Sequence, residues 1–185
     1  MKPDLIASIP MGKFTLPVAK RDHIQGPIDA PIVLLEYGDF ECPVCGEIYP
    51  VIKAIQDRMG DELCFAYRHF PMSNVHPHSV HAAEAAEAAG AQGSFWEMHD
   101  VLYENQDALD DEDLAEYAAE LGLDARRLVN EVLAGRYTAR VREDFRYGVR
   151  GGVNGTPTFF INGERYDGAR GLDPLLAALT QQSTY

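Results

Sequence analysis

Apolar positions follow two different patterns in the first part of this chain. Residues 31–37 form an almost continuous apolar run that Glu36 interrupts, which is typical of a strand buried on both faces. In residues 42–59, apolar side chains recur at steps of three and four. This spacing predicts a helix, with a kink at Pro50. Residues 63–70 predict a second strand.

The middle of the chain carries helical periodicity throughout. An Ala-rich stretch favours a helix, and Ser94 with Glu97 occupies the positions of a capping box at the start of another. Asp110 or Asp111 caps a third helix and Asp124 a fourth. Five helices are therefore predicted, over about residues 80–89, 95–103, 111–121, 125–134 and 137–147.

A β pattern returns near the C-terminus. Residues 158–161 and 164–166 are strand-like, and Asn162-Gly163 between them is a strong hairpin signal. A last helix is predicted over residues 173–180, with Pro174 at its first position.

The order of these elements suggests three parts. Residues 1–30 are punctuated by Pro and Gly, and we expect an N-terminal arm with one short strand over residues 14–18. Residues 31–72 and 152–185 together form an α/β domain, and residues 73–151 form an all-helical insertion.

Charge and composition narrow the classes of function. The formal net charge is −13 and the sequence pI is about 4.7, so nucleic acid and anionic membranes are poor partners. The sequence has no phosphate-binding glycine motif and no apolar run near the ~18 residues of a membrane span. The short apolar stretch after Met1 does not resemble a secretory signal, which predicts a cytoplasmic protein.

Cys42 and Cys45 carry the strongest chemical signal. They enclose Pro43 and Val44 at the junction between the predicted strand and helix. There the free N–H groups and the helix dipole favour a thiolate, and two thiols at this spacing can close a disulfide within one turn. Zinc sites use the same spacing but need about four ligands. Because Cys64 is the only other cysteine, a redox pair is favoured.

Further motifs appear in an order that resembles one family. Gly155-Thr156-Pro157-Thr158 precedes the hairpin, Arg68-His69-Phe70-Pro71 ends the second strand, and Phe95-Trp96-Glu97-Met98-His99-Asp100 opens a helix. Together with the cysteine pair, they resemble the DsbA-like thiol–disulfide oxidoreductases over about residues 14–182. The resemblance implies a thioredoxin-like α/β fold. In it, a central mixed sheet is flanked by helices, and a helical insertion separates the β-α-β and β-β-α halves.

The resemblance also implies roles for single residues. Cys42 resembles the attacking, more exposed thiol, and Cys45 the buried thiol that resolves the mixed disulfide. Pro157 resembles a cis-proline, which turns the backbone of Thr156 toward a client chain that pairs as an added strand. The substrates would be protein thiols and disulfides, with an unidentified recycling partner and no cofactor beyond the Cys42–Cys45 disulfide. The residues expected to contact the client are Phe40, Pro43, Val44, Thr156 and Pro157.

Glu36 is expected to move a proton during the exchange. An ionisable group in a buried strand is costly, and desolvation should raise its pKa toward neutrality. It could then accept the proton of Cys45 when that thiol attacks the mixed disulfide. The resemblance gives Glu36 the place of the family's buried acid. The alternative is a side chain that turns to solvent at the strand edge.

The dipeptide between the cysteines departs from the family pattern. Oxidising members often have His where this chain has Val44, so we expect the pKa of Cys42 to rise toward that of thioredoxin. Asp39 and Glu41 add negative charge that disfavours the thiolate. The potentials of thioredoxin and DsbA differ by about 150 mV, or roughly 7 kcal/mol. Reduction, isomerisation and oxidation of clients therefore all stay open.

Other interpretations stay open as well. The same fold could serve glutathione-dependent transfer or isomerisation, although relatives of that kind dispense with the second cysteine. A non-catalytic metal- or peptide-binding module is a further alternative. His76, His78 and His81 could bind a metal, but the simpler interpretation places them near the active site, where their titration tunes Cys42. Cys64 is interpreted as a small buried apolar residue, and no metal site is predicted.

Overall fold

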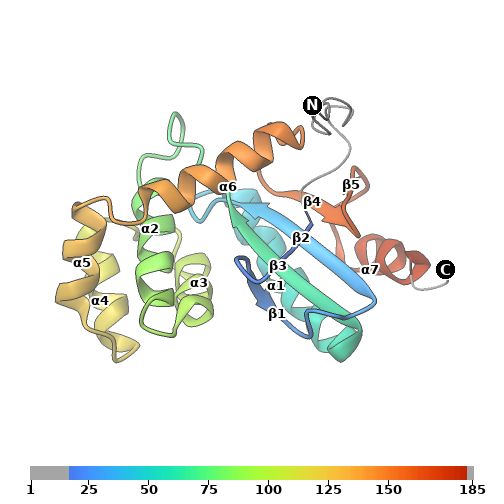
Figure 1. The fold of residues 1–185 in the computed structure, drawn as a ribbon, viewed down its shortest axis with the longest axis horizontal. Coiled ribbons are helices and arrows are strands. Elements are labelled where there is room, and N and C mark those ends of the chain that lie inside the picture. The colour runs from blue at the N-terminus through green and yellow to red at the C-terminus, as the bar shows by residue number, and fades with distance from the viewer. Residues whose placement is uncertain (1–16, 183–185) are drawn as a thin grey trace, which may run out of the picture.

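The computed structural model describes residues 17–182, with a five-stranded mixed sheet at its centre (Figure 1). The strand order is β1-β3-β2-β4-β5. β2 and β3 run parallel, and every other neighbouring pair is antiparallel. The strands span His23–Gln25 (β1), Ile32–Gly38 (β2), Leu63–His69 (β3), Thr158–Ile161 (β4) and Glu164–Tyr166 (β5).

Helices connect and cover this sheet. α1 links the parallel strands β2 and β3, five helices follow between β3 and β4, and the last helix follows the hairpin. The bounds are Pro43–Met59 (α1), Ser79–Gly90 (α2), Phe95–Glu104 (α3), Asp111–Glu120 (α4), Ala125–Leu133 (α5), Thr138–Arg150 (α6) and Leu172–Gln181 (α7). Within the described residues, no helix has both the length and the apolar character needed to cross a membrane.

Alternate residues of β2 build a core on each face of the sheet, because successive strand side chains point in opposite directions. Leu34 faces α1 and α7, where it belongs to one apolar cluster with Ile52 and Leu175. Leu35 faces the other way, into a cluster that Phe145 of α6 covers. Glu36 therefore belongs to the face of Leu34, on the side of α1.

Four helices of the insertion, α2 to α5, pack beside the sheet, whereas α6 packs over one of its faces. In Figure 1, α2 to α5 gather on one side, and α6 runs back across toward the sheet. α2 is rich in buried Ala residues, whose short side chains let α3, α5 and α6 approach it. The apolar cluster of the insertion continues into Cys42, Cys45 and Tyr67, so the insertion and the cysteine pair share one core.

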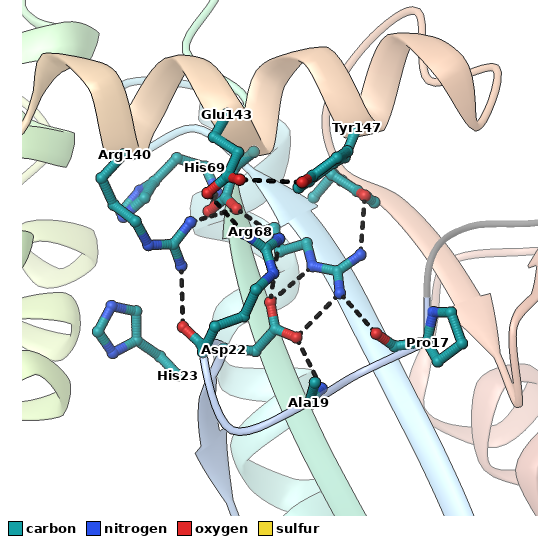
Figure 2. A network of polar contacts seen from close by, with 12 residues as sticks. Pro17, Ala19, Asp22, His23, Arg68, His69, Arg140, Glu143 and Tyr147 are labelled. Carbon is teal, nitrogen blue, oxygen red and sulfur yellow. Dashed lines mark hydrogen bonds and ion pairs between the residues drawn. The ribbon is translucent and has the colours of Figure 1, made fainter.

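The N-terminal segment is tied to the sheet and to α6 by polar contacts (Figure 2). Arg68 of β3, whose side chain is fully buried, donates from Nε and Nη2 to the two carboxylate oxygens of Asp22 at 2.8 and 2.9 Å. Its Nη2 also donates to the carbonyl oxygen of Pro17 at 3.2 Å. A buried guanidinium requires such partners, so Arg68 holds the segment in place.

The structure corrects the predicted N-terminal strand. Residues 14–16 lie outside the described part of the chain, and Pro17 and Val18 are not in a strand. Pro17 has no N–H for a sheet ladder, and its carbonyl oxygen accepts from Arg68 instead. The first described strand is β1, paired with β3. Its three residues are too few to show a two-residue period in the sequence.

Two predicted helix starts also differ. Ser94 is the N-cap of α3, but its side chain makes no capping hydrogen bond, because its backbone (ψ 44°) is not extended. α7 begins at Leu172, so Pro174 is its third residue; the first turn tolerates it because N–H groups there have no intrahelical partner. The Asn162-Gly163 hairpin is confirmed, with positive φ at both residues.

Candidate active site

The start of α1 places Cys42 and Cys45 together. Cys42 is the N-cap, with an extended backbone (φ −75°, ψ 119°), and Pro43 opens the helix, where its missing N–H breaks no bond. Cys45 lies in the first turn and shares a side-chain hydrogen bond with Cys42. Gln106 of the insertion anchors the turn, because its Nε2 donates to the carbonyl oxygens of Phe40 and Cys42 at 2.8 Å each.

A loop from the far end of the chain faces the thiols. The Thr156–Pro157 peptide bond is cis, as predicted. The Sγ atom of Cys42 lies 3.5 Å from the carbonyl oxygen of Thr156, although the two residues are 114 positions apart. They meet because β4, which follows the loop, pairs with β2, which precedes the cysteines.

The pKa values of the two thiols are shifted in opposite directions. The hydrogen bond from Cys45 lowers the pKa of Cys42 to about 5; burial opposes this effect, and Thr156 and the backbone N–H groups of the turn support it. Burial raises the pKa of Cys45, and the hydrogen bond to Cys42 and the charge of Glu36 raise it further. Cys42 is 6% exposed and Cys45 0%. At neutral pH, a thiolate therefore stands beside a protonated thiol.

The pKa of Cys42 lies between the pKa values of the reactive cysteines of DsbA and thioredoxin. At about 5, it is above the ~3.5 of DsbA and below the ~7 of thioredoxin. Each of the two carboxylates expected to oppose the thiolate lies beside an imidazole. His76 Nδ1 lies 2.7 Å from Asp39 Oδ2, and His78 Nδ1 lies 3.0 Å from Glu41 Oε1.

Glu36 points into the core and not to solvent. Its residue is 3% exposed, and its Oε1 has no hydrogen-bond partner among the described residues. Burial, together with the charge of Cys42, raises the pKa of Glu36 to about 8. The predicted direction is confirmed. The group is poised to gain or lose a proton near neutral pH, beside Cys45.

The predicted substrate-contact residues divide into two groups. Pro43 and Val44 are exposed beside Cys42, and Thr156 is half-buried. Pro157 is buried but lines the edge of a hollow. Phe40 is 1% exposed, and its ring packs on Tyr67 and Tyr103 at centroid distances of 5.3 and 4.9 Å. The prediction of a substrate contact at Phe40 is therefore wrong, because the insertion covers this side chain.

Two open hollows adjoin the thiols and the proline loop. One, of about 380 Å³, begins at Pro43 and is lined largely by acidic and polar side chains, among them Glu41, His76 and Asp110. The other, of about 370 Å³, begins at Pro157 and includes Arg165. An extended chain that crosses the thiols would find polar surface at both places.

A buried polar hub lies where the N-terminal segment meets β3 and α2, and sequence reasoning missed it. Nε2 of His23 and Nε2 of His69 each lie 2.9 Å from Oε1 of Glu87. Burial would raise the pKa of Glu87, but the hydrogen bonds and charges of the two imidazoles hold it well below its usual range. The signal in the sequence was an acidic residue inside an otherwise Ala-rich helix.

The same three residues have the chemistry of metal ligands. Their donor atoms lie within 4.8 Å of one another, and two imidazoles with a carboxylate form a set that zinc accepts. However, Nε of Arg140 already lies 3.7 Å from Glu87 Oε1 and brings a positive charge. We therefore interpret the cluster as a hydrogen-bonded hub that joins three elements. Figure 2 labels His23, His69 and Arg140, which come from β1, β3 and α6.

The remaining candidates are three histidines and Cys64, and of these His76 and His78 line the hollow that contains Pro43. His81 pairs with Asp111 at 2.6 Å, so His76, His78 and His81 each bind a different carboxylate and do not converge on one point. Cys64 is buried in β3, and burial raises its pKa, which describes an unreactive thiol.

Curated relatives match most of this chain. The chain is 44% identical over 160 residues to a protein named Na(+)/H(+) antiporter NhaA 1 of Salinispora arenicola; the match covers 86% of this chain and 24% of that protein. The chain thus spans about a quarter of the length of the curated relatives it matches.

Two solved structures match over nearly their whole length. BdbD of Bacillus subtilis matches with a TM-score of 0.83 at 21% identity, covering 95% of this chain and 99% of that one. Alpha-DsbA1 of Wolbachia pipientis matches with a TM-score of 0.75 at 18% identity, covering 91% and 95%. These likenesses confirm the predicted thioredoxin-like fold with its helical insertion. Because a family model described as thioredoxin matches residues 19–181, the chain belongs to the thioredoxin family.

Proposed function

We propose that this protein is an oxidoreductase that catalyses thiol–disulfide exchange on protein substrates, with Cys42 as the nucleophile and Cys45 as the resolving thiol. The contrast between the two thiols carries this proposal. The pKa of Cys42 is lowered to about 5, whereas burial raises that of Cys45. One thiol is ready to attack at neutral pH, and the other stays protonated until it is needed.

The exchange proceeds in two displacements. In the reducing direction, the Cys42 thiolate attacks a client disulfide, forms a mixed disulfide and releases one client thiolate. Glu36 then takes the proton of Cys45, whose sulfur attacks Cys42 Sγ, closes the Cys42–Cys45 disulfide and releases the second client thiolate. Oxidation of a client dithiol is the same sequence reversed.

The client binds as an extended segment across the thiols. The backbone of Thr156 offers a pairing edge, since its carbonyl oxygen lies 3.5 Å from Cys42 Sγ. The exposed Pro43 and Val44 add apolar contact on the other side of the nucleophile. Backbone pairing of this kind suits many sequences, so the proposal names protein cysteines as a class.

The antiporter names of the relatives are not extended to this chain. The shared region makes up about a quarter of those proteins, and ion transport belongs to the whole protein that carries the name. The proposed chemistry belongs to the cysteine pair of this chain.

Cysteine replacements test the proposal. With dithiothreitol as reductant and insulin as client, Cys42→Ser should abolish turbidity development above the uncatalysed rate. Cys45→Ser should accumulate a mixed disulfide that non-reducing electrophoresis detects. Cys64→Ser is the matched control and should keep wild-type activity, because Cys64 is buried in β3. Full activity of Cys42→Ser would show that the mechanism is wrong. Full activity of Cys45→Ser with glutathione would instead support the glutathione-dependent alternative.

A further inference from the structure

The loop between β3 and α2 is fixed beside Cys42 at two points. Near its start, Sδ of Met72 accepts the hydroxyl of Thr156 at 3.9 Å, and the carbonyl oxygen of Thr156 lies 3.5 Å from Cys42 Sγ. Further along the loop, His76 binds the side chain of Asp39, whose backbone carbonyl accepts the N–H of Cys42 at 3.1 Å. The loop therefore holds His76 close to the nucleophile.

The contacts of the His76 ring decide which of its nitrogens exchanges a proton. The two carboxylate oxygens of Asp39 accept backbone N–H groups at 2.9 and 2.8 Å, and an ionised carboxylate only accepts. Nδ1 of His76, 2.7 Å away, is therefore the donor to Asp39. Among the described residues, no hydrogen bond or ion pair involves Nε2, and the side chain is 19% exposed. Asp39 thus orients the ring and leaves Nε2 to gain and lose the proton.

The ring also lines a space beside the nucleophile. Pro43, which follows Cys42, and His76 belong to the same open hollow of about 380 Å³. A client disulfide that meets Cys42 beside Pro43 brings its sulfurs to the edge of this hollow. When Cys42 attacks one client sulfur, the other leaves as a thiolate whose thiol has a pKa of about 8.5. Such a basic thiolate leaves slowly, so a proton donor in the hollow speeds the step.

We propose that His76 is the general acid of the first displacement and gives its Nε2 proton to the client sulfur that leaves. This inference rests on the proposed function and adds a catalytic residue to it. The electron pair of the Cys42 thiolate forms the new S–S bond, and the electrons of the client S–S bond pass to the leaving sulfur. That sulfur takes the proton and departs as a thiol, while neutral His76 keeps its Nδ1 hydrogen on Asp39.

The charges around His76 favour its protonated form. Burial lowers its pKa, but the hydrogen bond and charge of Asp39, with the charges of Cys42 and Glu41, raise it overall. Glu41 also pairs with His78 at 3.0 Å. The other titratable groups that line the hollow are Asp107, Asp110 and Asp113. Since the pKa of Cys42 is about 5, a thiolate and a protonated His76 coexist between about pH 5 and pH 6.5.

Two mixed disulfides of one cysteine peptide test the proposal. In the first, the partner is a nitrothiophenol, whose thiolate leaves without a proton; in the second, it is mercaptoethanol, whose thiolate needs one. A Cys45→Ser background limits the reaction to the first displacement, followed as consumption of each disulfide. At pH 7, His76→Gln should slow the mercaptoethanol disulfide about ten- to hundredfold. It should change the aromatic disulfide by no more than about threefold, through the altered nucleophilicity of Cys42.

Two further readouts separate a proton donor from a structural residue. With the mercaptoethanol disulfide, the wild-type rate should rise through about pH 5 and fall above about pH 6.5, because deprotonated His76 has no proton to give. In His76→Gln the falling limb should be absent. Added imidazole should restore the mercaptoethanol reaction of His76→Gln, because the hollow is open to a small proton donor.

His81→Gln is the matched control, and it should react with both disulfides at the wild-type rates. His81 pairs with Asp111, and neither residue lines the hollow. Equal slowing of both disulfides by His76→Gln would overturn the inference, as would an equally large and selective loss in His78→Gln. Failure of the proposed function would look different, because Cys42→Ser would then consume the aromatic disulfide as fast as the wild type.

Discussion

His76 Nδ1 lies 2.7 Å from Asp39 Oδ2, at the turn that leads into Cys42. Asp39 also accepts the backbone N–H groups of Glu41 and Met72, so one buried carboxylate joins the thiol turn to the loop that carries His76. Burial lowers the pKa of His76, but the hydrogen bond and charge of Asp39, helped by the Cys42 thiolate, raise it overall. By reciprocity, protonated His76 stabilises the thiolate.

Replacement of His76 should therefore make Cys42 less acidic. We expect His76→Gln to raise the pKa of Cys42 by about 0.5 to 1, because an attractive cation is lost. The pH dependence of iodoacetamide alkylation measures this change. His81→Gln is the control, since His81 pairs with Asp111 on the insertion. Identical alkylation profiles for wild type and His76→Gln would contradict the prediction.

The reduction potential should lie between those of thioredoxin and DsbA. A more stable thiolate makes the dithiol form more stable and the disulfide more oxidising. With the pKa of Cys42 at about 5, between ~7 and ~3.5, we expect a potential between about −270 and −120 mV. Equilibration of the Cys42–Cys45 pair against glutathione buffers measures it. A value at or beyond either limit would mean that the thiolate is not what governs the potential here.

Glu36 should reduce stability at high pH. Because burial raises its pKa to about 8, the folded protein holds this proton more tightly than the unfolded chain. The stability that the proton provides is complete below about pH 4 and is lost as the pH rises through 8.

Glu36→Gln should therefore stabilise the reduced protein above pH 8 by up to about 5 kcal/mol and have little effect near pH 4. Urea unfolding at both pH values measures the difference. Equal effects at the two values would show that ionisation of Glu36 is not the cause.

Glu87, unlike Glu36, should stabilise the folded protein at neutral pH and lose this effect at low pH. The imidazoles of His23 and His69 hold its pKa below the usual range, so its contribution to stability is present above about pH 4.3 and is lost at lower pH. Glu87→Gln should destabilise the protein by about 1–3 kcal/mol at pH 7, and less as the pH falls to 3. Thermal unfolding across this range tests the sign, with the exposed Glu97→Gln as control. A loss that does not depend on pH would point to packing and not to charge.

Sequence reasoning succeeded where a short segment carries the whole signal. The cysteine pair at a strand–helix junction, the hairpin at Asn162-Gly163 and the acid inside an apolar strand each depend on neighbours within a few residues. The resemblance added the proline loop, and the structure confirms its cis bond. Sequence reasoning failed at Phe40, which was predicted to contact substrate. The insertion that buries this side chain lies far along the chain.

By itself, the sequence determined which chemical groups this protein has and in which local elements they stand, since hydrophobic periodicity and turn chemistry act over short distances. Only the tertiary structure decided which of those groups meet. The pairing of β4 with β2 brings Thr156 to Cys42, the packing of α3 brings Tyr103 to Gly38, and the N-terminal segment brings His23 to Glu87. The pKa values and the burial of these groups follow from such tertiary contacts. Desolvation and charge depend on neighbours that distant parts of the chain supply.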